Sequence, residues 1–346
     1  MISNSTRHTL KGWFDEPGAY VLVDGQFGST GKGLMAGVLA EMGAGKITHV
    51  TTNAGPNSGH VSYFGGEEIK LQQLPTAGVI LNKLGHPTTV YLNAGAVIDP
   101  TTLGHELRKY GSDKGIDLDI HPLAALIEDQ DVASDMLNTD HISSTGKGVG
   151  PALIRKIRRE KRNNRLLGHE AWNVDNYWDW SKDVVFVETA QGFSLGLNQN
   201  RFYPYVTSRE CTVMQAIADA RIPAQMVKKV ICCFRTYPIR VGSVGDGTSG
   251  GHYPDQQETT WEAIGVEPEL TTVTKRVRRV FTWSRQQFRE AVAANRPDVI
   301  FLNFCNYLEE YELSRLIDVI RVDYNKIIGK FPKILTGHGK YSGDVR

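Results

Sequence analysis

The chain has 346 residues, of which 40% are hydrophobic and 22% charged, and its formal net charge is +1. This balance excludes a protein whose whole surface attracts nucleic acid or a membrane, and no apolar run reaches the roughly 18 residues of a membrane-spanning helix. The first twelve residues are polar and contain no signal-peptide core, so we expect a cytoplasmic protein without nucleic-acid or membrane partners.

The first predicted strand, residues 19–23, leads into a glycine-rich turn, residues 25–33, and then into a helix over residues 34–42. This order is typical of a phosphate cradle, because backbone N–H groups and the helix N-terminus point at the anion. Lys32 adds a positive charge. A Walker A loop carries Ser or Thr after its lysine to hold magnesium, but Gly33 follows here. Glycine turns also occur without ligands, so a purely structural turn stays open at this point.

Further strands alternate with helices along the rest of the chain. We predict strands at residues 46–51, 90–93, 116–127, 184–187, 226–236, 299–304 and 333–336, and helices at residues 100–110, 152–165, 211–220 and 310–328. Such alternation predicts an α/β fold with a mainly parallel central sheet and helices on both faces. Sites in these sheets lie at the carboxyl ends of strands, where the polar loops of this chain fall.

The chain contains no repeat and no low-complexity linker that would divide it. We therefore expect a single domain over residues 1–346, with residues 1–18 as an N-terminal extension. The four cysteines, Cys211, Cys232, Cys233 and Cys305, have no metal-binding spacing, which predicts buried free thiols.

Seven loops, taken in order, resemble those of adenylosuccinate synthetases, which use GTP to join aspartate to IMP. These loops are residues 25–33, Asn57-Ser-Gly-His60, residues 144–151, Glu188-Thr-Ala-Gln-Gly192, residues 203–208, Arg240-Val-Gly242 and residues 274–279. The resemblance spans about residues 19–340. It implies the P-loop-NTPase-like fold of that family and a homodimer.

Two departures from the family pattern bear on the substrate. The family's first loop reads Gly-Asp-Glu-Gly-Lys-Gly, and its Asp takes the purine N1 proton, but Ser29 stands in that position here. The family's guanine-reading Thr/Asn-Lys-x-Asp motif is replaced by Asn303-Phe-Cys-Asn306. Both changes resemble the phage branch of the family, which joins aspartate to dGMP to make the precursor of 2-aminoadenine DNA. A phage origin implies the host cytoplasm.

Physical chemistry favours the same substrates. Serine is a poor base near neutral pH, but it is small and can accept a hydrogen bond from the amine beside N1 of guanine. The amide of Asn306 both donates and accepts, which weakens selection for the guanine of GTP. We therefore predict dGMP as the acceptor and ATP or dATP, rather than GTP, as the energy donor. What takes the N1 proton, whether water, phosphate or a second residue, stays open.

The resemblance implies a role for each of the following residues. The catalytic set is Ser29, Lys32, His60 and Gln191, with His60 donating to the purine oxygen and the leaving phosphate. The triphosphate is bound by Ser29, Thr30, Gly31, Lys32, Gly33, Gly59, His60, Asn303, Asn306 and Gly337. The monophosphate is bound by Ser29, Asn57, Ser144, Thr145, Gln191, Thr207 and, from the partner subunit, Arg159. L-Aspartate is bound by Thr274, Arg276 and Arg278, and Mg²⁺ by Ser29 and the Gly59 carbonyl.

Three other functions stay open from the sequence. The first is an ordinary adenylosuccinate synthetase that tolerates Ser29. The second is a nucleotide-binding regulator without catalysis, and the third is a generic phosphotransferase. The retention of His60, Gln191 and the arginine pair argues against a regulator, since a pure binder needs no aspartate clamp. The missing Walker hydroxyl disfavours a phosphotransferase.

Overall fold

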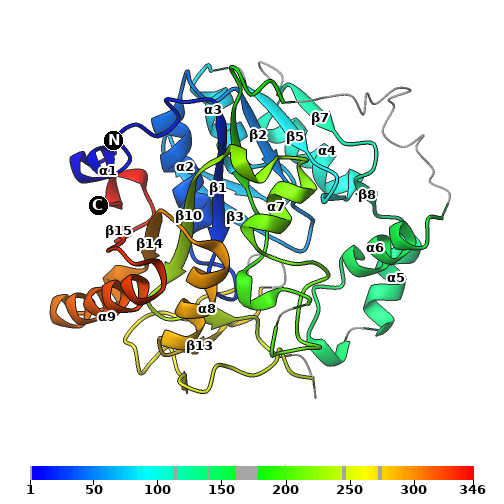
Figure 1. The fold of residues 1–346 in the computed structure, drawn as a ribbon. Coiled ribbons are helices and arrows are strands. Elements are labelled where there is room, and N and C mark those ends of the chain that lie inside the picture. Colours follow the sequence, from blue (N-terminus) through cyan, green and yellow to red (C-terminus); the bar gives the residue numbers. More distant parts are fainter. Residues whose placement is uncertain are drawn as a thin grey trace.

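The computed structural model describes residues 2–86, 88–111, 116–138, 140–160, 178–198, 200–243, 247–271 and 275–346. An eight-stranded sheet with the order β15-β14-β10-β1-β9-β2-β5-β7 runs through its centre, and all its strand pairs are parallel (Figure 1). Its strands are β1 (Gly18–Asp24), β2 (His49–Thr52), β5 (Thr89–Leu92), β7 (Leu118–Ile120), β9 (Val184–Glu188), β10 (Val227–Arg235), β14 (Val299–Asn303) and β15 (Lys333–Thr336).

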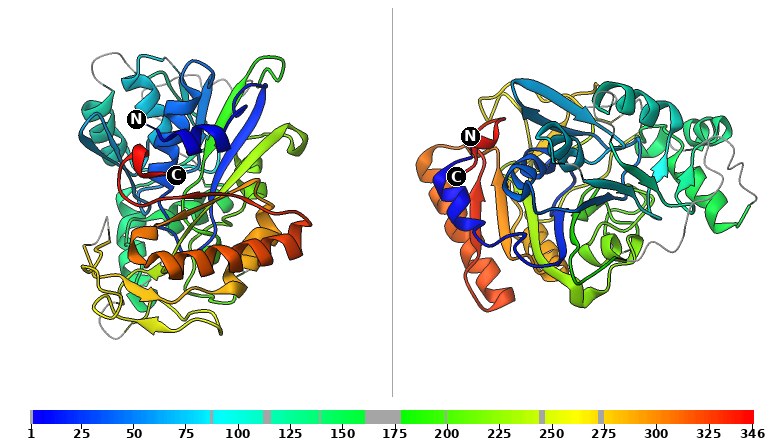
Figure 2. Two further views of the ribbon diagram at one scale, coloured as in Figure 1. Left: turned by 90° about the vertical axis from the view of Figure 1, so that its left-hand side faces the viewer. Right: turned by 90° about the horizontal axis from the view of Figure 1, so that it is seen from above.

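Helices cover both faces of this sheet (Figure 2). They are α1 (Asn4–Thr9), α2 (Lys32–Gly43), α3 (Thr76–Lys83), α4 (Pro100–Tyr110), α5 (Asp129–Asn138), α6 (Val149–Ile157), α7 (Val213–Asp219), α8 (Arg285–Asn295) and α9 (Glu310–Ile328). One core holds the buried side chains of α2 and α3, and a second holds those of α7, α8 and α9. The neighbouring residues Cys232 and Cys233 point into different cores, as expected for a strand. The predicted fold class is confirmed.

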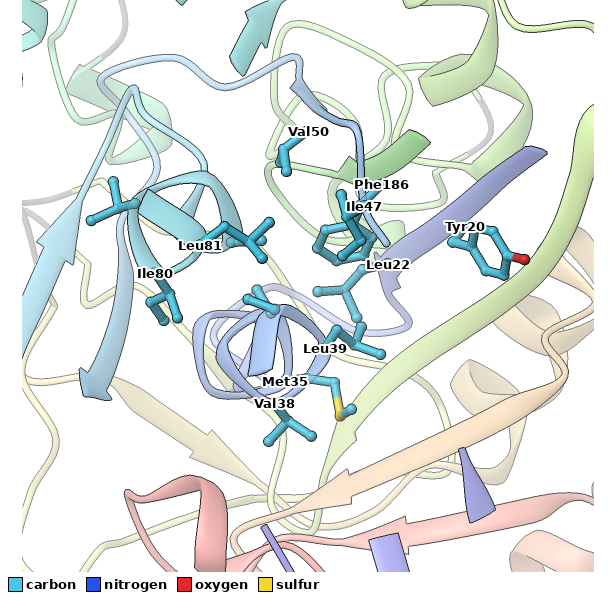
Figure 3. Close-up of a cluster of buried hydrophobic side chains, with 14 of the residues drawn as sticks. Tyr20, Leu22, Met35, Val38, Leu39, Ile47, Val50, Ile80, Leu81 and Phe186 are labelled. Carbon is cyan, nitrogen blue, oxygen red and sulfur yellow. The ribbon is translucent and has the colours of Figure 1, made fainter. Parts of the chain in front are cut away.

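The core that holds α2 and α3, the larger of the two, fixes the position of α2, which is the helix that follows the glycine-rich loop. Figure 3 shows Met35 and Leu39 of α2 among Leu22 of β1, Phe186 of β9 and Ile80 of α3, all of them buried. Burial of such side chains contributes about 1.5–3 kcal/mol each. The N-terminus of α2 is therefore held against the carboxyl end of β1.

Three smaller sheets surround the main one. They are an antiparallel hairpin of β3 (His60–Phe64) and β4 (Glu67–Leu71), a parallel pair of β6 (Val97–Ile98) and β8 (Ala125–Leu126), and an antiparallel set of β11 (Ile239–Arg240), β13 (Arg279–Phe281) and β12 (Glu258–Thr259). The turn of the hairpin is Gly65-Gly66, with φ of 59° and 84°. Two glycines supply these angles without strain.

The N-terminal residues pack into the body of the protein. Ile2, Leu10 and Phe14 are buried in the larger core. The hydroxyls of Ser3 and Thr6 donate to the Val345 carbonyl at 2.6 and 2.8 Å. The two chain ends therefore lie together, as Figure 1 shows. None of the helices in the described part of the chain has the length and apolar content that a membrane crossing requires.

Several predicted boundaries are wrong. The expected strand 116–127 is two strands, β7 and β8, in different sheets, because Pro122 cannot donate to a strand neighbour. Helix α6 begins at Val149, after Gly148 with φ of 78°, and ends at Ile157, whereas residues 161–165 lie outside the described residues. The hairpin β3–β4 and helices α3, α5 and α8 were not predicted. The cysteines are free, and Cys211 is only partly buried.

Candidate active site

Loops from several strand ends border one cavity of about 640 Å³. They follow β1, β2, β9, β14 and β15, so the polar loops do gather at the carboxyl edge of the sheet. Most predicted site residues line this cavity: Ser29, Thr30, Gly31, Lys32, Gly33, Asn57, Gly59, His60, Thr145, Gln191, Arg278, Asn303 and Asn306.

The glycine-rich loop is organised by the buried carboxylate of Asp24 at the end of β1. This group accepts hydrogen bonds from the N–H groups of Gln26 and Gly28 at 2.8 and 3.2 Å, and from the Thr30 hydroxyl at 2.5 Å. It also forms an ion pair with the Lys32 ammonium at 3.1 Å. Lys32 therefore borders the cavity as a fixed charge with a counter-ion.

At two positions of the glycine-rich loop, neighbouring atoms leave no space for a Cβ, so that only glycine fits. Gly31 has φ of 94°, and a Cβ there would lie 2.0 Å from the Asn303 amide nitrogen. A Cβ on Gly33 would lie 2.3 Å from the Val61 carbonyl oxygen of the hairpin. The Walker Ser or Thr that Gly33 replaces has no room here, so the absence of that hydroxyl has a packing cause.

Two buried arginines hold Ser29, whose φ is 55°. Arg278 donates from Nη1 to the Ser29 hydroxyl oxygen, and Arg235 donates from Nη1 to the Ser29 carbonyl at 3.2 Å. Arg235 also pairs with Glu269, through Nη1 to Oε2 at 3.1 Å and through Nη2 to Oε1. Burial would raise the pKa of Glu269, but the charge and hydrogen bonds of Arg235 lower it below its ordinary value. Burial lowers the pKa of Arg278 to about 10, so it stays charged at neutral pH.

Three carboxylates in or behind this part of the cavity have a basic side chain as partner. The pairs are Asp24 with Lys32, Glu269 with Arg235, and Glu188 with His60. Among the described residues that line the cavity, Glu269 is the one carboxylate. Ser29, predicted to stand where the family has its catalytic Asp, therefore presents a hydroxyl that already accepts a hydrogen bond from Arg278.

His60, at the start of β3, is oriented by Glu188 at the end of β9. The two side chains meet at 2.7 Å between Nδ1 and Oε1, and Glu188 is fully buried. Burial would raise the pKa of Glu188, but His60 and the Ala77 N–H, which donates to Oε2 at 3.1 Å, lower it. An ionised Glu188 requires a proton on Nδ1. For Nε2 to donate as well, the ring must carry both protons, and Glu188 is the counter-ion of that form.

Other predicted residues lie beside the cavity. The Thr207 N–H donates at 2.8 Å to the carbonyl of Leu195, which borders the cavity. The Ser144 hydroxyl accepts from the Gly146 N–H at 3.3 Å and does not line the cavity. Arg159, with φ of 58°, is exposed just after α6 and does not line the cavity of its own chain.

The residues predicted to bind L-aspartate do not all lie in the same part of the site. Arg278 lines the main cavity, and it also borders an adjoining open groove of about 580 Å³ that Arg276 borders. Thr274 lies outside the described residues.

Gly337 was predicted to contact the triphosphate, but both of its backbone polar groups are hydrogen-bonded within the chain. Its N–H donates to the Leu302 carbonyl at 2.8 Å, and its carbonyl accepts from the Cys305 N–H at 2.9 Å. The neighbouring Gly339 and Lys340 line the cavity instead.

The family model for adenylosuccinate synthetase matches residues 21–173 and 172–337. The chain belongs to the adenylosuccinate synthetase family. It is therefore a carbon–nitrogen ligase of this type, as the seven loops predict.

Individual members of the family differ in their similarity to this ligase. The N6-succino-2-amino-2'-deoxyadenylate synthase of Vibrio phage phiVC8 is 40% identical over 320 residues, which cover 87% of this chain and 90% of the relative. The adenylosuccinate synthetase of Thermococcus onnurineus is 31% identical over 277 residues, 76% of each chain. The solved structure of cyanophage S-2L succinoaminodeoxyadenylate synthetase, bound to dGMP and to dATP as an energy donor, has a TM-score of 0.83 at 31% identity and covers 96% of this chain and 95% of that chain.

Sequence reasoning missed several residues that shape the ligase site. Glu188 belongs to the motif Glu188-Thr-Ala-Gln-Gly192, three residues before the predicted site residue Gln191, and this placement could have identified it as a site residue. Arg235 and Tyr307 both contact Glu269, which is more than 30 residues away from each in sequence, and nothing local marks them.

Proposed function

We propose that this ligase joins L-aspartate to carbon 6 of dGMP with hydrolysis of ATP or dATP, giving N6-succino-2-amino-2'-deoxyadenylate. The observation that carries the proposal is Ser29: its small neutral hydroxyl leaves space for the guanine amine where the family has a carboxylate. The names of the phage relative and of the dGMP-bound cyanophage structure support the same substrates.

The order of the strands supports a site for two nucleotides. The loop after β1, with Ser29 and Lys32, lies between loops from the β9 side and loops from the β14 side. Strands lie about 4.8 Å apart, so β9 and β14, three spacings apart, are separated by roughly 14 Å. We place dGMP on the β9 side, the triphosphate base on the β14 side, and the transferred phosphoryl group at the loop between them.

The reaction then has two steps. Oxygen 6 of the purine attacks the γ-phosphorus, the bond to the β-phosphate oxygen breaks, N1 loses its proton, and a nucleoside diphosphate is released. The aspartate amine next attacks carbon 6, loses a proton, and displaces inorganic phosphate. His60, held by Glu188, donates to oxygen 6 and then to the leaving phosphate, which stabilises the charge that develops on these oxygens.

Magnesium fits this site if phosphate oxygens and waters provide most of its ligands. The described residues contain no group of three or more His, Cys, Asp or Glu side chains arranged for a metal. Mg²⁺ often takes only one or two protein ligands beside phosphates. We assign the Gly59 carbonyl and the Ser29 hydroxyl to it, and the ion would neutralise charge on the transferred phosphoryl group.

The arginine pair is proposed to bind L-aspartate. Arginine forks bind carboxylates bidentately, and Arg278 and Arg276 share the open groove beside the cavity. Binding there requires Arg278 to exchange its hydrogen bond with Ser29 for one with the substrate.

We also propose a homodimer in the cytoplasm of the host. Helices α5 and α6 expose an apolar surface that a second copy would cover, with Met136, Leu137, Ile154 and Ile157 at 60%, 84%, 48% and 75% exposure. Arg159 lies two residues beyond the end of α6, and we assign it to the partner's cavity.

The test incubates the protein with aspartate, Mg²⁺ and ATP, together with dGMP, GMP or IMP in separate reactions, and identifies products by mass. We expect the succinylated product from dGMP. Formation of adenylosuccinate from IMP without any product from dGMP would favour the ordinary synthetase. Nucleotide binding without any product would favour the regulator.

A further inference from the structure

An aromatic ring lies at the β14 side of the cavity. Phe304 directly follows β14, is half-buried, and lines the cavity beside Asn306 and Tyr307. Its backbone is left-handed, with φ of 59°, and its carbonyl accepts from the Thr236 hydroxyl at 2.8 Å. A bulky residue with such a backbone is unusual and needs support from its surroundings. The ring is therefore held in a defined place at the cavity wall.

The guanidinium of Arg235 covers one side of this ring. Its central carbon lies 3.9 Å from the ring centroid of Phe304, and Arg235 is fully buried. Within the described residues its Nε has no hydrogen-bond partner. The Tyr307 ring flanks Phe304 at 5.3 Å between centroids. Phe304 is half-buried and lines the cavity, so part of its side chain remains accessible from the cavity.

The position of Phe304 relates it to the phosphate loop. Asn303, the residue before it, lies so close to Gly31 that a Cβ on this glycine would be 2.0 Å from the Asn303 amide nitrogen. A triphosphate bound by residues 29–33 would therefore extend its nucleoside end toward this part of the wall.

We propose that Phe304 is the stacking surface for the purine base of the energy donor, with Arg235 against the opposite face of the ring. This inference rests on the proposed function, in which the β14 side of the cavity holds a nucleoside triphosphate. Stacking on an aromatic ring tolerates any base, because every base has a π-face. Phe304 therefore sets the affinity for purine triphosphates in general, and Asn306 at the base edge sets the choice between adenine and guanine.

The test compares Phe304→Ala, Phe304→Leu and Phe304→Trp with the unaltered protein. All three retain a Cβ, so the left-handed backbone affects them equally. Calorimetry measures the Kd of ATP, GTP and inorganic tripolyphosphate, and initial rates give the KM of ATP and dGMP. We expect Phe304→Ala to raise the Kd of ATP and of GTP by about 5- to 100-fold. Phe304→Leu loses affinity in the same direction, and Phe304→Trp retains it.

Tripolyphosphate has no base, so its Kd and the KM of dGMP stay unchanged if stacking is the cause. The inference is overturned if Phe304→Ala binds ATP as the unaltered protein does. It is also overturned if tripolyphosphate affinity falls as far as ATP affinity, since the phosphate loop would then be distorted. If the unaltered protein fails to ligate dGMP, the proposed function fails, but the binding measurements still decide the role of Phe304.

Discussion

The two sides of the cavity are built from different kinds of side chain. The centre and the β9 side carry the Lys32–Asp24 ion pair and His60 hydrogen-bonded to the buried carboxylate of Glu188. The β14 side presents an aromatic ring, Phe304, and the exposed neutral amide of Asn306, with Arg235 of the Arg235–Glu269 ion pair behind the ring.

Under the proposed function, this difference assigns the chemistry to the first side and the selection of the energy donor to the second. Fixed, desolvated charges stabilise developing charge without reorganisation, as phosphoryl transfer requires. Rings and amides bind a base without changing the barrier of the reaction. Substitutions on the first side should therefore lower kcat, and substitutions on the second should change the KM of the triphosphate.

The largest effect is expected for His60→Ala. Loss of the donor to purine oxygen 6 should lower kcat by about 10²–10³-fold, with folding retained. Steady-state rates and circular dichroism measure both properties. His8→Ala, at an exposed histidine of α1, is the control and should behave as the unaltered protein. A kcat of His60→Ala near that control would remove His60 from the mechanism.

Glu188→Gln should have the next largest effect. An amide cannot act as counter-ion to a doubly protonated His60, so kcat should fall by about 10- to 100-fold, as for loss of a charged hydrogen bond. The KM of ATP should not change, and Glu188→Asp should recover part of kcat. A purely structural role for Glu188 would instead lower the melting temperature and change every kinetic constant together.

Arg278→Lys keeps the positive charge but removes the fork that binds a carboxylate. We expect the KM of aspartate to rise by about tenfold or more, while the KM of ATP stays the same. Arg321→Lys, at an exposed arginine of α9 that borders neither the main cavity nor the open groove, is the matched control and should leave the KM of aspartate unchanged. An unchanged aspartate KM in Arg278→Lys would contradict the clamp.

Asn306→Asp should give the smallest change in rate and a change in donor. A carboxylate accepts both N–H groups of guanine, so the preference for ATP over GTP should move toward GTP by roughly 5- to 100-fold. The ratio of kcat/KM for the two triphosphates measures this shift. Asn325→Asp, on α9 outside the cavity, should leave the ratio unchanged. An unaltered ratio in Asn306→Asp would show that this position does not read the base.

Local signals in the sequence predicted the elements that depend on local chemistry. Helix α4 begins at Pro100 after the cap Asp99, whose carboxylate accepts from the Thr101 N–H at 3.1 Å. Helix α9 matches its predicted bounds, with a capping box at its start and Gly329, φ 85°, at its end. The cap at Asp99 predicted the start of α4, and the 3.6-residue period predicted α9, whose capping residues are likewise adjacent to the helix in sequence.

The site was only partly predictable. The loop residues that line the cavity follow strands, so a parallel sheet was enough to bring them together. The network of Ser29, Arg235, Glu269 and Arg278 joins segments more than 200 residues apart in sequence, as the 206-residue separation of the Arg235–Ser29 hydrogen bond shows. Contacts of this kind depend on tertiary packing, which no local pattern encodes.

The most direct test of the central claim is a competition between two acceptors. Equal concentrations of dGMP and IMP react with limiting protein, aspartate, Mg²⁺ and ATP, and mass spectrometry measures the ratio of the two succinylated products, which equals the ratio of kcat/KM values. With Ser29 leaving room for the guanine amine, N6-succino-2-amino-2'-deoxyadenylate should predominate. Predominance of adenylosuccinate would contradict the account.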